Sequence, residues 1–320
     1  MLEDNLISKR QKDGLKGYRL MRKGKEGLLQ MDADKFSFYL ADGADFSMRK
    51  SMLTQRMRQH RVSETLAMME QAGIPKDRDQ KAHLFEEERS QSEAYTQAAF
   101  FHPKEVKVQT DLTRKIISSR MTGVWLSDDA LRICYNIGTM LPTWFETVEN
   151  RADILVRSML REKGLEFPIT DAVLFGKSME QAVDCLKDDK MRAYLMNTSF
   201  GRFCYIPLDE RGVIQLKLMN DQESYQCLKN ILSEDLEVDT EDLYPEYDGY
   251  NADGLPTLIC IDCDLKRLIR FRTRLQYMGR SGEVICFDFQ KEAIRSYCGE
   301  ETKISTVDLE TVNRRILAGG

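Results

Sequence analysis

Three short motifs in this 320-residue chain have residue types and spacings that could carry chemistry. Glu105-Val106-Lys107 has the spacing with which metal-dependent nucleases place a carboxylate ligand and a charge-stabilising lysine. Gly176-Lys177-Ser178 follows an apolar stretch, as it does in loops that bind nucleotide phosphates. Cys260 and Cys263 have the spacing of redox and zinc sites. Each motif also has an ordinary structural explanation.

For all three motifs, the structural explanation is stronger than the catalytic or ligand-binding one. A chain this rich in Glu and Lys produces about one Glu-x-Lys triplet by composition alone, and no aspartate pair on a preceding strand accompanies this one. A phosphate loop needs a glycine where Asp171 stands, and Ser178 with Gln181 fits a helix capping box. The cysteine pair has no second pair to complete a zinc site, so the eight cysteines are interpreted as buried apolar side chains. We expect no catalytic residue, no metal and no cofactor.

The pattern that points most directly to a function is a basic N-terminal region. Residues 1–62 contain fourteen Lys or Arg and eight acids, a net charge of +6, whereas the whole chain carries −5. Lys and Arg bind nucleic-acid phosphates by displacing condensed counterions, so this local excess favours DNA contact. The alternative is a solvated basic face on a helical subdomain. The residues that we predict to contact DNA are Lys12, Lys16, Arg19, Arg22, Lys23, Arg49 and Arg56.

Turn and strand signals indicate how the basic N-terminal residues are positioned. Residues 2–11 are interpreted as the end of a helix. Gly14 and Gly17 then mark a turn, and residues 18–21 a short strand of a hairpin. After a second turn, a helix is expected to begin at about Lys25. The predicted basic residues would therefore lie on or beside a hairpin.

The middle of the chain predicts a helical connector. Residues 46–72 are expected to form one long helix with an apolar stripe, which Gly73 and Pro75 end. Residues 75–98 are polar and charged and indicate a linker or an exposed helix. The predicted domains are residues 1–40, residues 41–99 as the connector, and residues 100–320.

Residues 100–320 predict a mixed-sheet α/β domain, because hairpins come first and strands alternate with helices later. We expect hairpins over residues 122–138 and 202–219, and a solvated acidic insertion over residues 233–248. Further strands are predicted at 171–176, 257–262, 283–289 and 303–307, and helices at 144–163, from 179, and at 225–232, 265–278, 291–297 and 309–317.

Residues 14–150 resemble the replication-relaxation proteins, which are carried by plasmids and integrative conjugative elements of Gram-positive bacteria. The resemblance rests on three segments: residues 5–29, the basic helix at 56–74 and the hairpin at 119–138. It implies a winged-helix DNA-binding unit joined to a domain that resembles the restriction-nuclease fold. Residues 1–40 would be the wing and last helix of that unit, with the helices that should precede Asn5 missing.

The resemblance also implies that the nuclease-like domain is inactive. The family's hairpin often carries Arg-Pro-Asp-Gly, followed by a Glu and an Asp. At the matching positions this chain has Thr122 in the first motif and Tyr135 and Asn136 later. These side chains cannot hold a divalent metal as carboxylates would. The domain is therefore expected to be a scaffold.

These observations lead us to expect a non-enzymatic DNA-binding accessory protein of a plasmid or conjugative element, acting in replication or transfer. Its expected partner is double-stranded DNA, with transfer or replication proteins and a second copy of the chain as further candidates. Two alternatives stay open: a metal-dependent nuclease using Glu105 and Lys107, and a protein-interaction module without nucleic acid. No apolar run approaches the roughly 18–20 residues of a membrane span and no signal peptide is evident, so we expect a cytoplasmic protein with no membrane contact.

Overall fold

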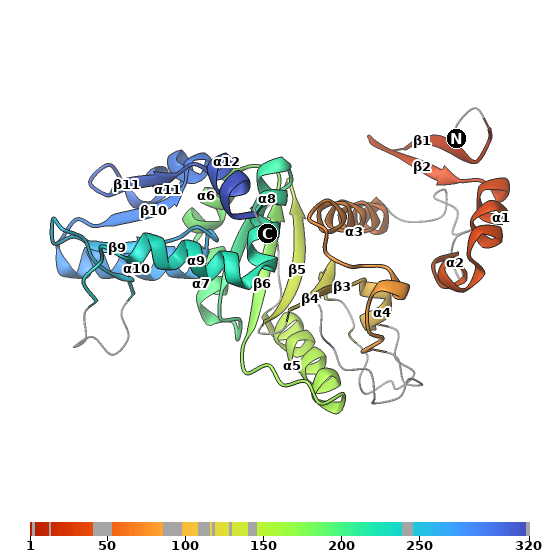
Figure 1. Ribbon diagram of the computed structural model, residues 1–320, viewed down its shortest axis with the longest axis horizontal. Coiled ribbons are helices and arrows are strands. Elements are labelled where there is room, and N and C mark those ends of the chain that lie inside the picture. The colour runs from red at the N-terminus through yellow and green to blue at the C-terminus, as the bar shows by residue number, and fades with distance from the viewer. Residues whose placement is uncertain are drawn as a thin grey trace.

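The fold is a mixed α/β body with a small N-terminal hairpin unit set apart from it, beyond helix α3 (Figure 1). This computed structural model describes residues 1, 4–12, 14–40, 53–85, 98–107, 116, 119–127, 130–139, 146–238 and 246–317. The mixed α/β class expected from the sequence is confirmed.

The N-terminal unit is an antiparallel hairpin followed by two helices. Strand β1 (Ile7–Lys12) pairs with β2 (Leu15–Leu20) across a tight turn, in which Gly14 has a φ of +78° that favours glycine. The predicted helix end at residues 2–11 is wrong, because Asn5 turns into the left-handed region and residues 7–12 pair as a strand. Gly17 lies inside β2 rather than in the turn. The helices are α1 (Arg22–Met31), which begins three residues before the expected start, and α2 (Ala33–Leu40).

A five-stranded mixed sheet forms the centre of the body. Its order is β3-β4-β5-β6-β7; the first three strands are antiparallel, and β5, β6 and β7 run parallel. The hairpin predicted at residues 122–138 is confirmed as β4 and β5. The strand bounds are β3 (Ala99–Phe101), β4 (Gly123–Leu126), β5 (Leu131–Gly138), β6 (Thr170–Gly176) and β7 (Phe203–Pro207).

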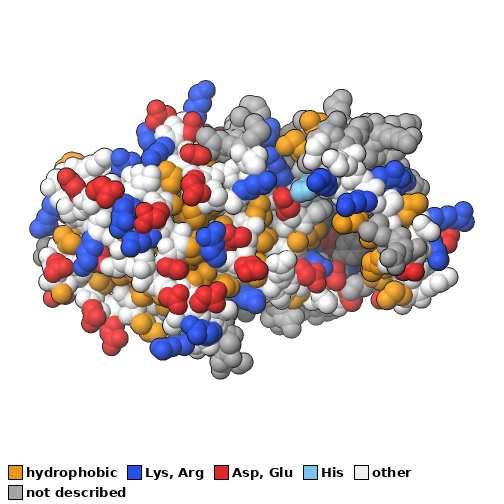
Figure 2. Space-filling view, turned by 90° about the horizontal axis from the view of Figure 1, so that it is seen from above, with side chains coloured by type: hydrophobic (Ala, Val, Ile, Leu, Met, Phe, Trp, Pro, Cys, Tyr) orange, Lys and Arg blue, Asp and Glu red, His pale blue; other side chains and the backbone are white. Residues whose placement is uncertain are grey.

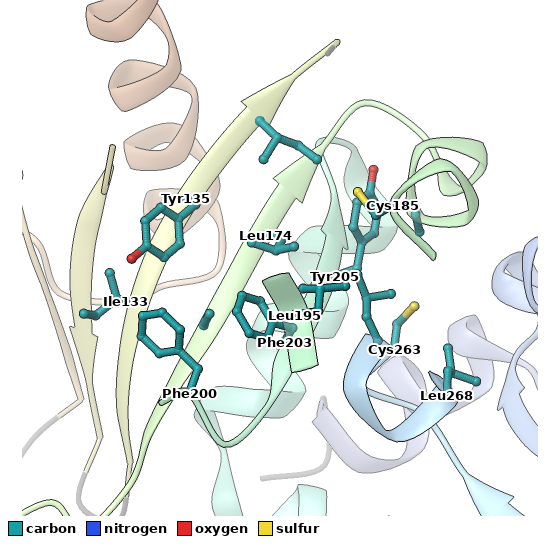
Figure 3. Packing of buried hydrophobic residues seen from close by; sticks show 14 of the residues in the cluster. Ile133, Tyr135, Leu174, Cys185, Leu195, Phe200, Phe203, Tyr205, Cys263 and Leu268 are labelled. Atoms are coloured by element: carbon teal, nitrogen blue, oxygen red, sulfur yellow. The ribbon is translucent and has the colours of Figure 1, made fainter. Parts of the chain in front are cut away.

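Helices cover both faces of this sheet. On one face, α3 (Leu53–Gln71) and α8 (Glu210–Asn220) pack in a cluster that includes Met69, Cys134 and Phe175. The other face contributes Ile133, Tyr135 and Leu174, and Figure 3 shows these side chains in one cluster with Phe200, Phe203 and Tyr205. Because both faces are covered, β5 is buried along its whole length. The helices on this second face are α5 (Glu146–Glu162), α6 (Met179–Lys187) and α7 (Asp189–Asn197).

A second sheet extends the body towards the C-terminus. Its order is β11-β10-β9-β8, with the three later strands parallel, and the alternation of strands and helices predicted for this region is confirmed. One hydrophobic cluster continues across both sheets, so the two sheets share a core. The bounds are β8 (Gly249–Tyr250), β9 (Pro256–Ile259), β10 (Glu283–Phe287), β11 (Lys303–Val307), α9 (Gln222–Ser233), α10 (Leu265–Met278), α11 (Lys291–Cys298) and α12 (Leu309–Val312).

The hairpin predicted at residues 202–219 is wrong, because β7 is followed by helix α8. The Asp209 carboxylate accepts hydrogen bonds from the backbone N–H groups of Arg211 and Gly212 and so caps the first turn of that helix. Gly212 is required by close packing rather than by a turn, since a Cβ there would lie 1.9 Å from the Pro207 carbonyl oxygen.

Buried charges join the two sheets at the outer edge of β7. The Arg202 guanidinium donates to Asp171 at 2.6 and 2.8 Å and to Asp262 at 3.3 Å. Asp264 caps α10, and one of its oxygens accepts from the Phe203 backbone N–H at 3.2 Å. Its Oδ2 is buried and has no hydrogen-bond partner in the described part of the chain. Burial, and then the neighbouring Asp262, raise the pKa of Asp264 to about 6.

This raised pKa predicts a pH dependence of stability. In the unfolded chain an aspartate loses its proton near pH 4, whereas folded Asp264 keeps its proton to about pH 6, so stability falls as pH rises through that window. Asp264→Asn keeps an oxygen that can cap α10 but cannot ionise. Between pH 4 and pH 7, urea unfolding should show the variant gaining about 1–3 kcal/mol relative to the wild type. Parallel stability curves for the two proteins would contradict this role of Asp264.

Candidate nucleic-acid interface

The register of the N-terminal hairpin decides which basic side chains share a face. Lys9 lies opposite Tyr18, and Gln11 lies opposite Lys16, so both lysines lie on the face that carries Tyr18. Arg10, opposite Gly17, lies on the other face. Tyr18 is 64% exposed, and the three basic residues are exposed as well. The hairpin therefore presents positive charge on both faces, with an aromatic ring beside the lysines.

The predicted DNA-contacting residues are placed unequally. Lys16 and Arg19 are exposed on β2, and Arg22 and Lys23 are exposed at the start of α1. Arg56, by contrast, is 5% exposed on α3, so it does not belong to this surface. The last two predicted residues are Lys12, which lies in β1, and Arg49, which lies outside the described residues.

Among the residues that the structure describes, some of the exposed cations have a hydrogen-bond or ion-pair partner close by in the chain, and others do not. Arg22 donates to Glu26 at 2.7 Å, one helical turn away, and this hydrogen bond raises the pKa of Arg22. Lys23 approaches the Asp4 carbonyl oxygen at 3.5 Å. Lys9, Arg10 and Lys16 form no ion pair with any residue that the structure describes. These three hairpin residues therefore carry the charge that is most available to a phosphate. Figure 2 shows basic side chains at this end of the molecule, and basic and acidic side chains intermingled over the α/β body.

A second group of polar residues lies where α3 crosses the ends of β4 and β5. The Thr65 hydroxyl donates to the Thr122 hydroxyl at 3.1 Å, within the buried contact between α3 and the sheet. The Asn136 amide donates to the Arg61 carbonyl oxygen and to the Glu64 carboxylate, each at 3.1 Å. The structure thus places Thr122 and Asn136, two of the three positions singled out by the family resemblance, at one end of the sheet beneath α3. Among the described residues, no group of His, Cys, Asp or Glu is arranged to hold a metal ion.

Next to this end of the sheet, a buried carboxylate is held by three neutral donors. Glu149 on α5 is 1% exposed and accepts hydrogen bonds from the Ser119 hydroxyl at 2.8 Å, the Arg120 backbone N–H at 2.9 Å and the Tyr135 hydroxyl at 3.0 Å. These bonds satisfy its oxygens and fix the chain segment before β4. Burial, and then the Glu149 charge, raise the pKa of Tyr135, which keeps its proton and remains a donor.

The Glu105-Val106-Lys107 triplet lies on the short helix α4 (Pro103–Lys107) rather than on a strand. The Glu105 carboxylate forms an ion pair with Lys81 at 2.8 Å and accepts from the His102 backbone N–H at 2.6 Å. Lys107 instead donates to the Ser119 carbonyl oxygen at 2.8 Å. Glu105 is therefore engaged in a structural pair, whereas Lys107 belongs to the group near Ser119.

The other two sequence motifs have structural roles. Ser178 is the N-cap of α6, but its side chain makes no capping hydrogen bond; Gln181 accepts instead from the Lys177 backbone N–H at 3.0 Å. A Cβ at Gly176 would lie 2.1 Å from the Tyr205 hydroxyl, so this glycine makes room for a ring. All eight cysteines are free; Cys227 is exposed, Cys298 is half-buried, and the other six are buried as expected.

Comparison with known proteins identifies no relative, since no protein family, curated protein or solved structure matches this chain. Within the described ranges, no helix is both long enough and apolar enough to cross a bilayer.

The sequence did not single out Arg58 or Glu149 as candidate site residues. Both are placed near Ser119 by contacts between distant segments of the chain, which no sequence spacing indicates.

The Lys81–Glu105 pair generates a stability prediction. The two side chains are 1% and 6% exposed, so Glu105→Ala would leave a buried ammonium without its counter-charge. Urea unfolding should show a loss of about 3–5 kcal/mol for this variant, and the double variant Lys81→Met/Glu105→Leu should recover part of that loss. If Glu105→Ala is as stable as the wild type, the carboxylate has no structural role and is free for another one.

Proposed function

We propose that this chain is a non-enzymatic DNA-binding protein whose N-terminal hairpin contacts the phosphate backbone. The observation that carries the proposal is the hairpin itself, on which Lys9, Arg10 and Lys16 are exposed and form no ion pair with described residues. Cations of this kind bind phosphates through counterion release without distinguishing base sequence. Arg19 and Lys23 lie close enough in the chain to extend the contact.

The α/β body serves in this proposal as a scaffold for partner proteins. The resemblance to replication-relaxation proteins supports a role in the replication or transfer of a plasmid or conjugative element. It also supports a nuclease-like origin of the body, in which Thr122 and Asn136 occupy positions where the family often has carboxylates. In this chain Asn136 is an amide donor to Glu64 and Thr122 accepts from Thr65, so both positions serve packing of α3.

The metal-dependent nuclease is the less favoured alternative. Its proposed carboxylate, Glu105, is paired with Lys81 and faces away from solvent, whereas a metal ligand needs oxygens that can reach the ion. A protein-interaction module is also compatible with a basic hairpin, because acidic protein surfaces attract the same side chains. The dependence of binding on salt and on single hairpin residues separates DNA contact from these alternatives.

The DNA-binding proposal predicts a defined salt response. A fluorescein-labelled duplex should bind at micromolar protein near roughly 50 mM salt, with log affinity falling linearly against log salt. In Lys9→Gln/Lys16→Gln, the slope should decrease by about 0.9 for each phosphate contact removed, and affinity should fall for every duplex sequence. Lys190→Gln, an exposed lysine on α7, is the matched control and should behave as the wild type. Absence of binding, or an unchanged slope in the hairpin variant, would refute the proposal.

The proposal also predicts that the protein does not cut DNA. Supercoiled plasmid incubated with the protein and magnesium or manganese should remain supercoiled, because Glu105 is committed to Lys81. Nicking that persists through purification and disappears in Glu105→Gln would instead establish the nuclease. The glutamine variant is preferred to alanine here because it retains the shape of the side chain in its buried position.

A further inference from the structure

Four basic side chains from three segments gather at the end of β4 nearest to α3. Arg58 and Arg61 come from α3, Lys107 is the last residue of α4, and Arg120 lies just before β4. The Arg58 guanidinium and the Lys107 ammonium donate to the same atom, the Ser119 carbonyl oxygen, each at 2.8 Å. Two cationic donors therefore converge on one neutral oxygen. Arg58 and Arg120 are exposed, and Lys107 and Arg61 are half-buried.

The acids that the structure describes near this group neutralise it only in part. The Glu149 oxygens accept from the Ser119 hydroxyl, the Arg120 backbone N–H and the Tyr135 hydroxyl. Glu64 bonds to the Asn136 amide and lies 3.3 Å from His60. Among the described residues, four cations thus face two carboxylates, which leaves net positive charge at this end of the sheet.

Burial and mutual repulsion together lower the pKa values of three of these cations. Burial, and then the Arg58 charge, lower the pKa of Lys107 to about 7, although Glu149 opposes the shift. Burial also lowers the pKa of Arg58 and of Arg61, and the Arg120 charge lowers both further. An anion that enters the group stabilises it, because it offsets the repulsion among the cations and favours the ammonium form of Lys107. The arginines are charged with or without the anion.

We propose that Arg58, Lys107 and Arg120 form a site for a phosphate group of the DNA backbone, a second contact beside the hairpin. The inference rests on the proposed DNA-binding function for its ligand, but the site itself is defined by the three cations. A phosphate offers several acceptor oxygens, so the guanidinium forks of the two arginines and the ammonium of Lys107 can each take one. Contacts of this kind position a duplex without reading its sequence.

Binding at this site is coupled to protonation of Lys107. Within the described part of the chain, the charged groups that face Lys107 are Arg58 from α3 and Glu149 from α5. The nearby His102 stays neutral across pH 6–8, because burial and then Lys81 lower its pKa to about 4. A phosphate favours the ammonium form of Lys107, so binding takes up a proton, and affinity falls as pH rises above about 7. One coupled proton corresponds to about a tenfold loss between pH 6.5 and pH 8.

Pyrophosphate in calorimetric titration is the probe that tests the site independently of DNA. Because pyrophosphate itself loses a proton in this pH range, the ratio of affinities at pH 6.5 and pH 8 is compared between variants. The ratio for the wild type should exceed the ratio for Lys107→Arg about tenfold. Arg58→Gln/Arg120→Gln should lose at least tenfold at both pH values, and Lys190→Gln should match the wild type. Lys107→Arg, whose charge does not titrate, should bind at both pH values without this extra tenfold change. Thermal unfolding of each variant checks that it is folded, and Arg120→Gln alone, an exposed position, serves if the double variant is not.

The same variants in DNA titration separate this inference from the proposed function. Loss of DNA affinity in Lys9→Gln/Lys16→Gln but not in folded Arg58→Gln/Arg120→Gln would overturn the second site and leave the hairpin contact standing. Pyrophosphate binding that depends on Arg58 and Arg120, in a protein that binds no duplex, would leave the anion site standing and overturn DNA as its ligand. Pyrophosphate affinity that is unchanged in the folded double variant would overturn the site itself.

Discussion

The packing of α3 against the mixed sheet is the contact on which the candidate interface depends. Met68 and Met69 of this helix are buried against strand residues such as Trp125 and Cys134. Within the same contact, the Thr65 and Thr122 hydroxyls are hydrogen-bonded. The apolar face fixes the rotation of α3. Arg61 and Arg58, one and two turns before Thr65, must therefore lie towards the segment that precedes β4. A helix free to roll or slide would not hold Arg58 on the Ser119 carbonyl oxygen.

Charged side chains in different parts of this molecule have different kinds of hydrogen-bond partner. At the sheet junction, Arg202 lies between Asp171 and Asp262, and under α4 the Lys81 ammonium is paired with Glu105. In both places each cation meets a carboxylate directly, as expected where charge is present only for structure. Near Ser119 the cations instead share a neutral carbonyl oxygen, while Glu149 is satisfied by neutral donors. Unbalanced charge in a partly exposed place has a natural explanation in a ligand that supplies the missing anion.

Much of the fold could be predicted from the sequence, because local signals were unambiguous where single residues decided the outcome. Helix α10 was predicted with its observed bounds, since Asp264 caps its start and Gly279 adopts the left-handed conformation at its end. The hairpin prediction for residues 202–219 was wrong because glycine is common in turns. Gly212 is instead needed because α8 begins close to the Pro207 carbonyl oxygen. The candidate site was harder, because a count of charges treats Arg56 and Lys16 alike although only Lys16 is exposed. The group around Ser119 depends on long-range contacts that no spacing reveals.

The two basic surfaces differ in physical character, and this suggests how one chain would use both. Hairpin cations such as Lys9 and Lys16 are exposed, so salt screens their attraction strongly and no fixed geometry restricts where a phosphate can bind. Lys107 is half-buried and already hydrogen-bonded, so its neighbourhood is screened less and its geometry is fixed. Because the cations near Lys107 are weakly screened and fixed in orientation, they can hold a phosphate in one position only. A hairpin of exposed lysines can bind a phosphate in many positions. In the proposed complex, the hairpin therefore gathers the duplex, and the rigid group at the end of β4 determines how the duplex lies against the α/β body.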